Sequence, residues 1–236
     1  MMSEKEETAD GFAANFDLGL RQKAEWRPKH SVSERALKRA IDIVVSVLVL
    51  ISHSWLYLIV WLCVRHTTGS PAIYCHRRIG RGGKEFSCLK FRSMQVNSAE
   101  ILEQYLKQNP EARAEWERDF KLRDDPRVTK FGRIIRRTSL DELPQFWNVL
   151  KGEMSLVGPR PVVEKELKTY YGDRASYYMS VRPGITGPWQ VGGRNDIKYE
   201  RRVQLDTQYA KDWSVLGDIG IVVKTIQVVV VGRGSY

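Results

Sequence analysis

An apolar run from Ile43 to Val64 constrains the fold of this chain more than any other feature. It is about 22 residues long, enough for one helix to cross a bilayer. Positive charge tends to stay on the cytoplasmic side of a membrane, and a simple span would carry one basic flank across. These flanks comprise Arg35, Lys38 and Arg39 before the run, and Arg65, His66, Arg77, Arg78 and Arg81 after it.

The centre of the run is polar, because Ser52, His53 and Ser54 stand together there. Polar groups cost most at the middle of a bilayer. A re-entrant helical hairpin accommodates both features: two arms of about 11 residues would reach roughly 16 Å into a hydrocarbon core of roughly 30 Å. We therefore predict a re-entrant anchor with both ends in the cytoplasm. A single span and a buried core helix are the alternatives.

Length and composition indicate one soluble domain of ordinary size beside the anchor, since 42% of the 236 residues are hydrophobic and 28% are charged. The net charge of +10 points to a polyanionic neighbour: anionic lipid headgroups, nucleotide phosphates or nucleic acid. Cys63, Cys75 and Cys88 lack metal-ligand spacing, so we expect reduced thiols in a cytosolic setting.

The chain divides into three predicted parts: a mobile cytosolic tail (1–31), a re-entrant membrane helix (32–66) and a cytosolic domain with membrane-surface helices (67–236). The domain begins with a β-hairpin, in which 72–78 and 85–91 flank a glycine-rich turn at 80–83. Helices follow over 98–120, divided at Asn109-Pro110, and from near Ser139. The β-branched stretch 215–231 could form a strand or a helix, and we favour a helix. Residues 158–161 and 182–188 are expected to be loops. The predicted fold class is α+β, mainly helical.

Asp141 and Glu142 are the sharpest candidates for chemistry. Ser139 and Glu142 have the spacing of a capping box, so both acids can be read simply as helix-start residues. The same helix start would offer backbone N–H groups to a phosphate, with Arg136 and Arg137 beside it. One carboxylate could then attack phosphorus while its neighbour holds Mg²⁺. This pattern favours phosphoryl transfer over glycoside hydrolysis, whose carboxylates flank a sugar from opposite sides.

Further polar residues on strand ends and Gly/Pro loops suit an anionic substrate. A basic loop residue taken alone is usually a solvated or lipid-facing charge, but the repeated combination with Pro and Gly makes substrate binding an equal alternative. The candidates are Lys90, Arg92, Arg160, Arg182, Gln190 and Arg194.

Several motifs together resemble the bacterial sugar transferases, which are small monotopic polyprenyl-phosphate phosphoglycosyl transferases. The resemblance extends from about Glu34 to Tyr236, and within the family it is greatest to the galactosyl-1-phosphate transferases that start rhizobial exopolysaccharide synthesis. The motifs are Lys90-Phe91-Arg92-Ser93-Met94, the stretches 139–145, 148–155 and 157–161, and Arg182-Pro183-Gly184-Ile185-Thr186-Gly187.

The resemblance implies transfer of hexose 1-phosphate from UDP-galactose or UDP-glucose to undecaprenyl phosphate, with release of UMP. It implies that Asp141 is the nucleophile, that Glu142 binds Mg²⁺ and that Arg136 contacts phosphate. It also implies that the loop 159–161 helps to form the nucleotide pocket. The domain 67–236 would then be catalytic and face the cytoplasm at the bacterial inner membrane, among its lipids. A homodimer is left open, and no nucleic acid is expected.

One position departs from the family pattern. Relatives usually carry Ser-Pro at the bend of the membrane helix, where this chain has Ser54-Trp55. Without proline, the bend must rely on Ser52 and Ser54 bonding back to backbone carbonyls. The sequence allows two other functions: a membrane-tethered module that binds nucleic acid, and an inactive scaffold. The arginines interrupt loops around an acid pair rather than lining one helix face, which disfavours the first. The intact acid pair disfavours the second.

Overall fold

The computed structural model describes residues 30–119, 122–192 and 198–231. The predicted mobile tail lies almost wholly outside these ranges, as does Arg194. The described chain is mainly helical and has two small two-stranded sheets, which confirms the predicted fold class.

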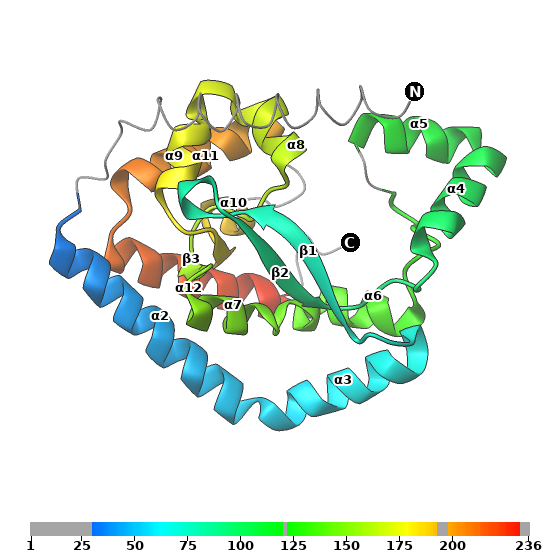
Figure 1. The fold of residues 1–236 in the computed structure, drawn as a ribbon, viewed down its shortest axis with the longest axis horizontal. Coiled ribbons are helices and arrows are strands. Elements are labelled where there is room, and N and C mark those ends of the chain that lie inside the picture. The colour runs from blue at the N-terminus through cyan, green and yellow to red at the C-terminus, as the bar shows by residue number, and fades with distance from the viewer. Residues whose placement is uncertain (1–29, 120–121, 193–197, 232–236) are drawn as a thin grey trace, which may run out of the picture.

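Two helices form the predicted anchor region: α2 (Val32–Ser52) and α3 (Ser54–Thr68). They meet in a wide V at the lower edge of Figure 1. A capping box starts α2, because Ser31 accepts from the Glu34 backbone N–H while the Glu34 carboxylate accepts from that of Ser31. No single described helix is long and apolar enough to cross a membrane. Only α2 and α3 together meet that criterion, and they are bent by 66°.

The bend between α2 and α3 is made by side chains that compete for backbone carbonyls. Ser52 Oγ donates to the Leu48 carbonyl at 2.6 Å, as predicted. The second contact comes from the His53 ring, whose Nδ1 lies 3.2 Å from the Val49 carbonyl oxygen. The expected contribution of Ser54 is not found among the described hydrogen bonds. His53 takes this position because it is the residue that caps α2.

The hairpin pairs β1 (Ile73–Ile79) with β2 (Glu85–Phe91) in antiparallel register, as predicted. The turn η1 (Arg81–Gly83) places Gly82 at φ 71° and Gly83 at φ 75°, the left-handed region that favours glycine. In this register Cys88 lies opposite His76, and Cys75 lies opposite Leu89. All three cysteines are free thiols.

The predicted break at Asn109-Pro110 separates α4 (Ser98–Gln108) from α5 (Pro110–Asp119). Three short elements follow: α6 (Lys130–Arg137), the 3₁₀ turn η2 (Leu140–Glu142) and α7 (Gln145–Lys151). Together they carry the chain across the open side of the V, where α6 contacts α3 and α7 contacts α2 (Figure 1).

The second sheet pairs β3 (Ser155–Val157) with β4 (Gly184–Thr186) in parallel. The segment 182–188, predicted to be a loop, therefore contains a short strand, and the reason is this pairing with a distant segment. The remaining elements are α8 (Glu164–Glu166), η3 (Leu167–Tyr171), η4 (Gly172–Arg174), α9 (Ala175–Ser180), α10 (Pro188–Val191), α11 (Tyr199–Asp212) and α12 (Val215–Val231). The helix predicted over 215–231 is confirmed.

Polar contacts fix the first half of α2 to the domain. Asp42, 2% exposed, accepts from the Ser155 hydroxyl and the Leu156 backbone N–H. Arg39 donates to the carbonyl of Val149 at 2.6 Å and to that of Leu150 at 2.9 Å. Both carbonyls belong to the last turn of α7. Lys38 pairs with Asp218 on α12. These buried partners hold the N-terminal half of α2 against the domain.

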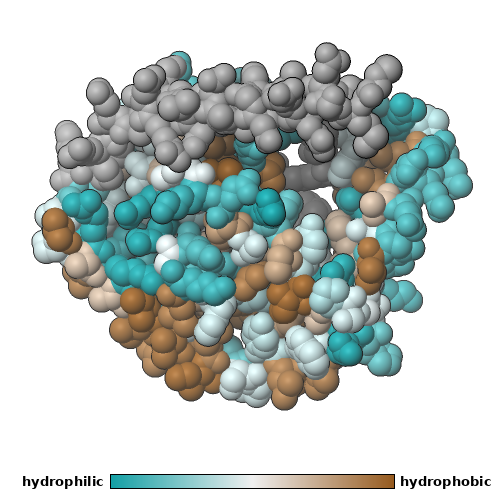
Figure 2. Space-filling model, viewed as in Figure 1, coloured by the Kyte–Doolittle hydropathy of each residue, from teal (hydrophilic) through white to brown (hydrophobic). Residues whose placement is uncertain are grey.

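Beyond these contacts, the two arms of the V present apolar side chains to the outside. Figure 2 shows hydrophobic surface gathered along the lower edge of the molecule. The exposed apolar residues of the two arms include Val44, Leu48, Ile51, Trp55, Leu58, Ile59 and Leu62. An exposed apolar surface of this kind marks a binding or membrane-contact region.

Candidate active site

Asp141 and Glu142 lie in the 3₁₀ turn η2, between α6 and α7, and not in the first turn of an α-helix. Ser139 has φ 57° and ψ 16°, and its side chain makes no capping bond. The predicted capping box is therefore wrong. An N-cap needs extended backbone angles, whereas here a left-handed residue reverses the chain after α6. The expected phosphate cradle of helix N–H groups disappears with it, so side chains must supply the positive charge.

Asp141 is nearly buried, at 9% exposure. Burial raises its pKa to about 6, and the neighbouring carboxylate of Glu142 adds to the rise. Lys90, Arg136 and Arg160 act in the opposite direction. An aspartate in this environment is largely ionised at neutral pH, yet it has few water molecules around it. Both properties suit a nucleophile.

Glu142 differs from Asp141 although the two are adjacent in the chain. Burial acts to raise its pKa, but the charges of Lys90 and Arg160, with hydrogen bonds from Lys90 and Gln145, outweigh that effect and lower it. Lys90 Nζ lies 2.6 Å from Glu142 Oε1 and 4.0 Å from Asp141 Oδ2. Glu142 is thus the more firmly ionised of the two acids.

Three cations from three segments act on Asp141. Lys90 projects from β2, the strand of the hairpin that contacts η2. Arg136 comes from the last turn of α6, where its Nε donates to Ser93 Oγ at 2.8 Å. Arg160 follows β3, with its guanidinium carbon 5.2 Å from the centroid of the Trp189 ring. The structure thus brings three of the sequence-predicted binding residues to the acid pair.

The other predicted binding residues have different surroundings. Arg92 Nε donates to the Pro71 carbonyl, and its guanidinium lies over the Tyr74 ring. Arg182 Nε donates to the Gly152 carbonyl, and the charges that affect it are those of Arg81, Arg39 and Asp42. Gln190 Nε2 donates to the Ile185 carbonyl. The partners of these three side chains in the contacts above are residues other than Asp141 and Glu142.

Three site residues were not among the sequence predictions. Ser93 holds Arg136, Gln145 hydrogen-bonds Glu142, and Trp189 lies against Arg160. Ser93 and Gln145 belong to the motifs 90–94 and 139–145, so their place in these motifs could have marked them as site residues. Trp189 had no such signal, because only the fold brings α10 beside the 158–161 loop.

Asp206, Tyr171 and Arg202 form a buried polar cluster near Arg160. Asp206 is fully buried, accepts a hydrogen bond from the Tyr171 hydroxyl at 2.6 Å and lies 3.8 Å from Arg202 Nε. Burial raises its pKa to about 6, against the effects of Tyr171, Arg202 and Arg160. Arg160 therefore influences both Asp141 and Asp206.

Among the described residues there is no group of three or more His, Cys, Asp or Glu side chains arranged to hold a metal. Mg²⁺ commonly needs only one or two protein carboxylates, because substrate phosphates and water complete its six ligands. Glu142 suits that role, since its pKa is lowered and its side chain is 28% exposed. The residues present therefore fit a Mg²⁺ shared with a bound phosphate, provided that Lys90 yields part of its contact.

The family of the chain follows from comparison with known proteins. The family model for bacterial sugar transferases matches residues 33–232. The chain belongs to the bacterial sugar transferase family.

Three relatives illustrate the similarity. The chain is 55% identical over 204 residues to an undecaprenyl-phosphate galactose phosphotransferase of Salmonella typhimurium, covering 86% of this chain and 42% of the relative. It is 50% identical over 199 residues to the exopolysaccharide production protein ExoY of Sinorhizobium fredii, covering 84% and 88%. It is 40% identical over 209 residues to the UDP-glucose:undecaprenyl-phosphate glucose-1-phosphate transferase of Escherichia coli, covering 86% and 42%. The chain thus spans less than half of the Salmonella and Escherichia relatives.

Proposed function

We propose that this chain transfers hexose 1-phosphate from a UDP-sugar, galactose or glucose, to undecaprenyl phosphate as the first step of exopolysaccharide synthesis. The observation that carries the proposal is a nearly buried Asp141 beside an ionised Glu142, with Lys90, Arg136 and Arg160 acting on it. The names of the relatives support the substrate class.

In the proposed first step, a carboxylate oxygen of Asp141 attacks the phosphorus that carries the sugar. The new Asp141 O–P bond forms as the bond to the bridging oxygen breaks, and UMP leaves with that electron pair. In the second step, a phosphate oxygen of undecaprenyl phosphate attacks the same phosphorus. The Asp141 carboxylate is regenerated, and the product is a lipid diphosphate sugar.

The cations would stabilise the charge that builds up on the phosphate oxygens during both steps. Arg136 and Arg160 can each make paired N–H contacts to phosphate, whereas Lys90 acts as a compact charge beside both acids. Ser93 and Trp189 hold the two arginines. When bound, Mg²⁺ would neutralise the diphosphate and favour departure of UMP. Glu142 would hold it.

For the membrane arrangement, we propose that α2 and α3 dip into the cytoplasmic leaflet of the inner membrane and return. The 66° bend, the apolar exterior of both arms and the basic Arg65 and His66 in the last turn of α3 support this placement. On α12, Leu216, Ile219, Val223 and Ile226 are exposed at near-helical spacing, which suits a helix lying on the membrane surface.

The chemistry is tested by incubating purified protein with UDP-galactose or UDP-glucose and Mg²⁺, without lipid acceptor, and measuring intact mass. We expect one added hexose phosphate on the wild type and none on Asp141→Asn. Asp124→Asn, which removes an exposed acid, is the matched control and should still form the adduct. An adduct that persists in Asp141→Asn would refute the assignment of the nucleophile.

The topology is tested separately, by labelling single cysteines placed at Ser33 and Thr67 in intact cells with a reagent that does not cross membranes. We expect neither position to react from outside. Labelling of either one would mean that the helix pair crosses the membrane completely.

A further inference from the structure

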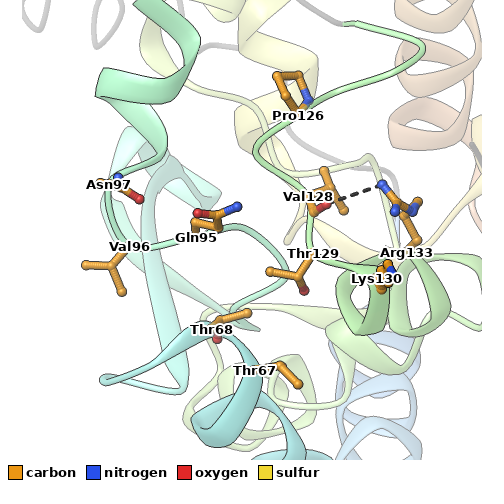
Figure 3. A pocket seen from close by; sticks show the side chains of 10 residues that line it. All are labelled: Thr67, Thr68, Gln95, Val96, Asn97, Pro126, Val128, Thr129, Lys130 and Arg133. Carbon is orange, nitrogen blue, oxygen red and sulfur yellow. Dashed lines mark hydrogen bonds between the residues drawn. The ribbon is translucent and has the colours of Figure 1, made fainter. Parts of the chain in front are cut away.

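A polar pocket lies between the end of α3 and the N-terminal end of α6, whereas the acid pair follows the C-terminal end of α6. Its volume is about 550 Å³. Figure 3 shows Gln95 and Asn97, from the segment after β2, on one side of the pocket and Lys130 and Arg133, from α6, on the other. Thr67 and Thr68 from α3 lie below them in this view. Lys130 and Arg133 are both exposed.

An apolar hollow of about 560 Å³ borders this pocket, and Thr67 lines both. Leu62, Cys63 and Phe131 form its apolar wall, and Arg65 and His66 also line it. Leu62 is 52% exposed and continues the apolar exterior of α3. The two spaces together therefore run from the apolar surface of the helix pair to a cationic pocket.

This order of surfaces matches one kind of molecule, an amphiphile with an anionic head and a hydrocarbon tail. Among the described residues that line the two spaces, none is acidic. Arg133 donates to the Val128 carbonyl with one nitrogen, at 3.4 Å, which leaves other N–H groups of its guanidinium for an anion. Cations next to a membrane surface attract anionic lipid headgroups.

We propose that this double pocket binds one anionic phospholipid of the membrane. Lys130 and Arg133 contact its phosphate, and an acyl chain lies against Leu62 and Phe131. The proposal rests on the proposed membrane placement and is independent of the proposed chemistry.

The position of the pocket favours a resident lipid over the lipid acceptor. An acceptor phosphate must reach a group carried by Asp141, which follows the C-terminal end of α6. Lys130 is at the N-terminal end of α6, roughly 9 Å along the helix axis from Arg136. Between them, Gly132 packs against the Ser93 carbonyl so closely that a Cβ there would collide with it. A phosphate bound beside Lys130 is thus set apart from the reacting atoms.

The experiment uses the full chain in nanodiscs that contain phosphatidylcholine with or without phosphatidylglycerol, followed by native mass spectrometry of the lipids that remain bound. We expect the wild type to retain phosphatidylglycerol in preference to phosphatidylcholine. Lys130→Gln/Arg133→Gln should weaken that retention about 30-fold, because each cation near a membrane surface is worth roughly a fivefold change.

Two variants serve as controls. Lys107→Gln/Arg113→Gln removes the same charge from exposed ion pairs on α4 and α5 and should retain lipid like the wild type. Asp141→Asn should also retain it, so a failure of the proposed chemistry would not affect this result. Leu62→Gln should weaken retention of both lipids, because it acts on the tail and not on the head.

Three outcomes would overturn the proposal. The first is equal retention of phosphatidylglycerol by the wild type and Lys130→Gln/Arg133→Gln. The second is displacement of the bound phosphatidylglycerol by inorganic phosphate, at the same concentration at which phosphate binds the lipid-free protein. That result would identify a free-phosphate site. The third is displacement by undecaprenyl phosphate together with a raised KM for that acceptor in the double variant, which would identify the acceptor site.

Discussion

The ammonium group of Lys90 contacts Glu142 at 2.6 Å and lies 4.0 Å from Asp141, so one cation serves both acids unequally. This asymmetry keeps the pKa of Glu142 below its ordinary value while that of Asp141 stays raised at about 6. Two adjacent residues of similar chemistry thereby acquire different properties. In the proposed function, one is the nucleophile and the other the metal ligand.

The first prediction concerns pH. With a pKa of about 6, Asp141 is half protonated near pH 6 and gains its nucleophilic charge as pH rises. UMP release should therefore fall below pH 6 and level off above about pH 7. Lys90→Gln removes the cation that most opposes the effect of burial, so it should move this acid limb upward by roughly one unit or more. The measurement is the rate of UMP release between pH 5 and 9.

Lys90→Arg is the control for charge alone and should shift the acid limb less than Lys90→Gln. An acid limb that stays at the same pH in Lys90→Gln would show that another group controls it.

The second prediction concerns the hydrogen bond that positions Arg136. Ser93→Ala removes the acceptor of its Nε and should lower kcat/KM for the UDP-sugar by about 10- to 100-fold, the usual range for a hydrogen bond to a charged group. Ser93→Thr keeps the hydroxyl and should recover part of the loss. Ser87→Ala, at an exposed position of β2, should have no effect. An unchanged kcat/KM in Ser93→Ala would show that Ser93 does not position Arg136 for the reaction.

The third prediction contrasts two helical glycines. Gly→Ala inside a helix normally stabilises by up to about 1 kcal/mol, and Gly220→Ala should do so because nothing lies within 4 Å of the added methyl group. Gly132→Ala should instead destabilise by about 1–3 kcal/mol, because its Cβ meets the Ser93 carbonyl. Thermal unfolding of both variants measures the difference. Equal Tm values would contradict the close packing of α6 on Ser93.

The fourth prediction concerns the stability contributed by Asp206. Its pKa is raised to about 6 in the folded protein, so the folded state binds a proton more tightly than the unfolded state. The resulting stabilisation is complete below the unfolded pKa near 4 and is lost as pH rises through about 6. It amounts to at most about 3 kcal/mol.

Asp206→Asn cannot titrate and should lack this contribution to pH dependence. The wild-type Tm should therefore decrease more than that of Asp206→Asn between pH 4.5 and 7.5. Asp141 titrates in both proteins, so the difference isolates Asp206. Parallel Tm curves would show that its folded pKa is not raised.

Much of the architecture was readable from local sequence. The turn 80–83 predicted the hairpin because its glycines allow positive φ, and Asn109-Pro110 predicted the break between α4 and α5. The polar centre of the apolar run predicted the bend between α2 and α3, with His53 in the place expected for Ser54. These features depend on neighbouring residues, so a linear pattern is enough to identify them.

The sequence by itself identified Asp141 and Glu142 as the candidate reactive acids. It also identified Lys90, Arg136 and Arg160 as cations for an anionic substrate. The tertiary structure decided which cations meet the acids, because Lys90 and Glu142 are on different elements and only the packing of β2 on η2 joins them. It also set Ser139 in the left-handed region, since the chain must reverse between α6 and α7. Local preference at Ser139 favoured a helix cap, but the packing of α6 against α3 and of α7 against α2 outweighed it.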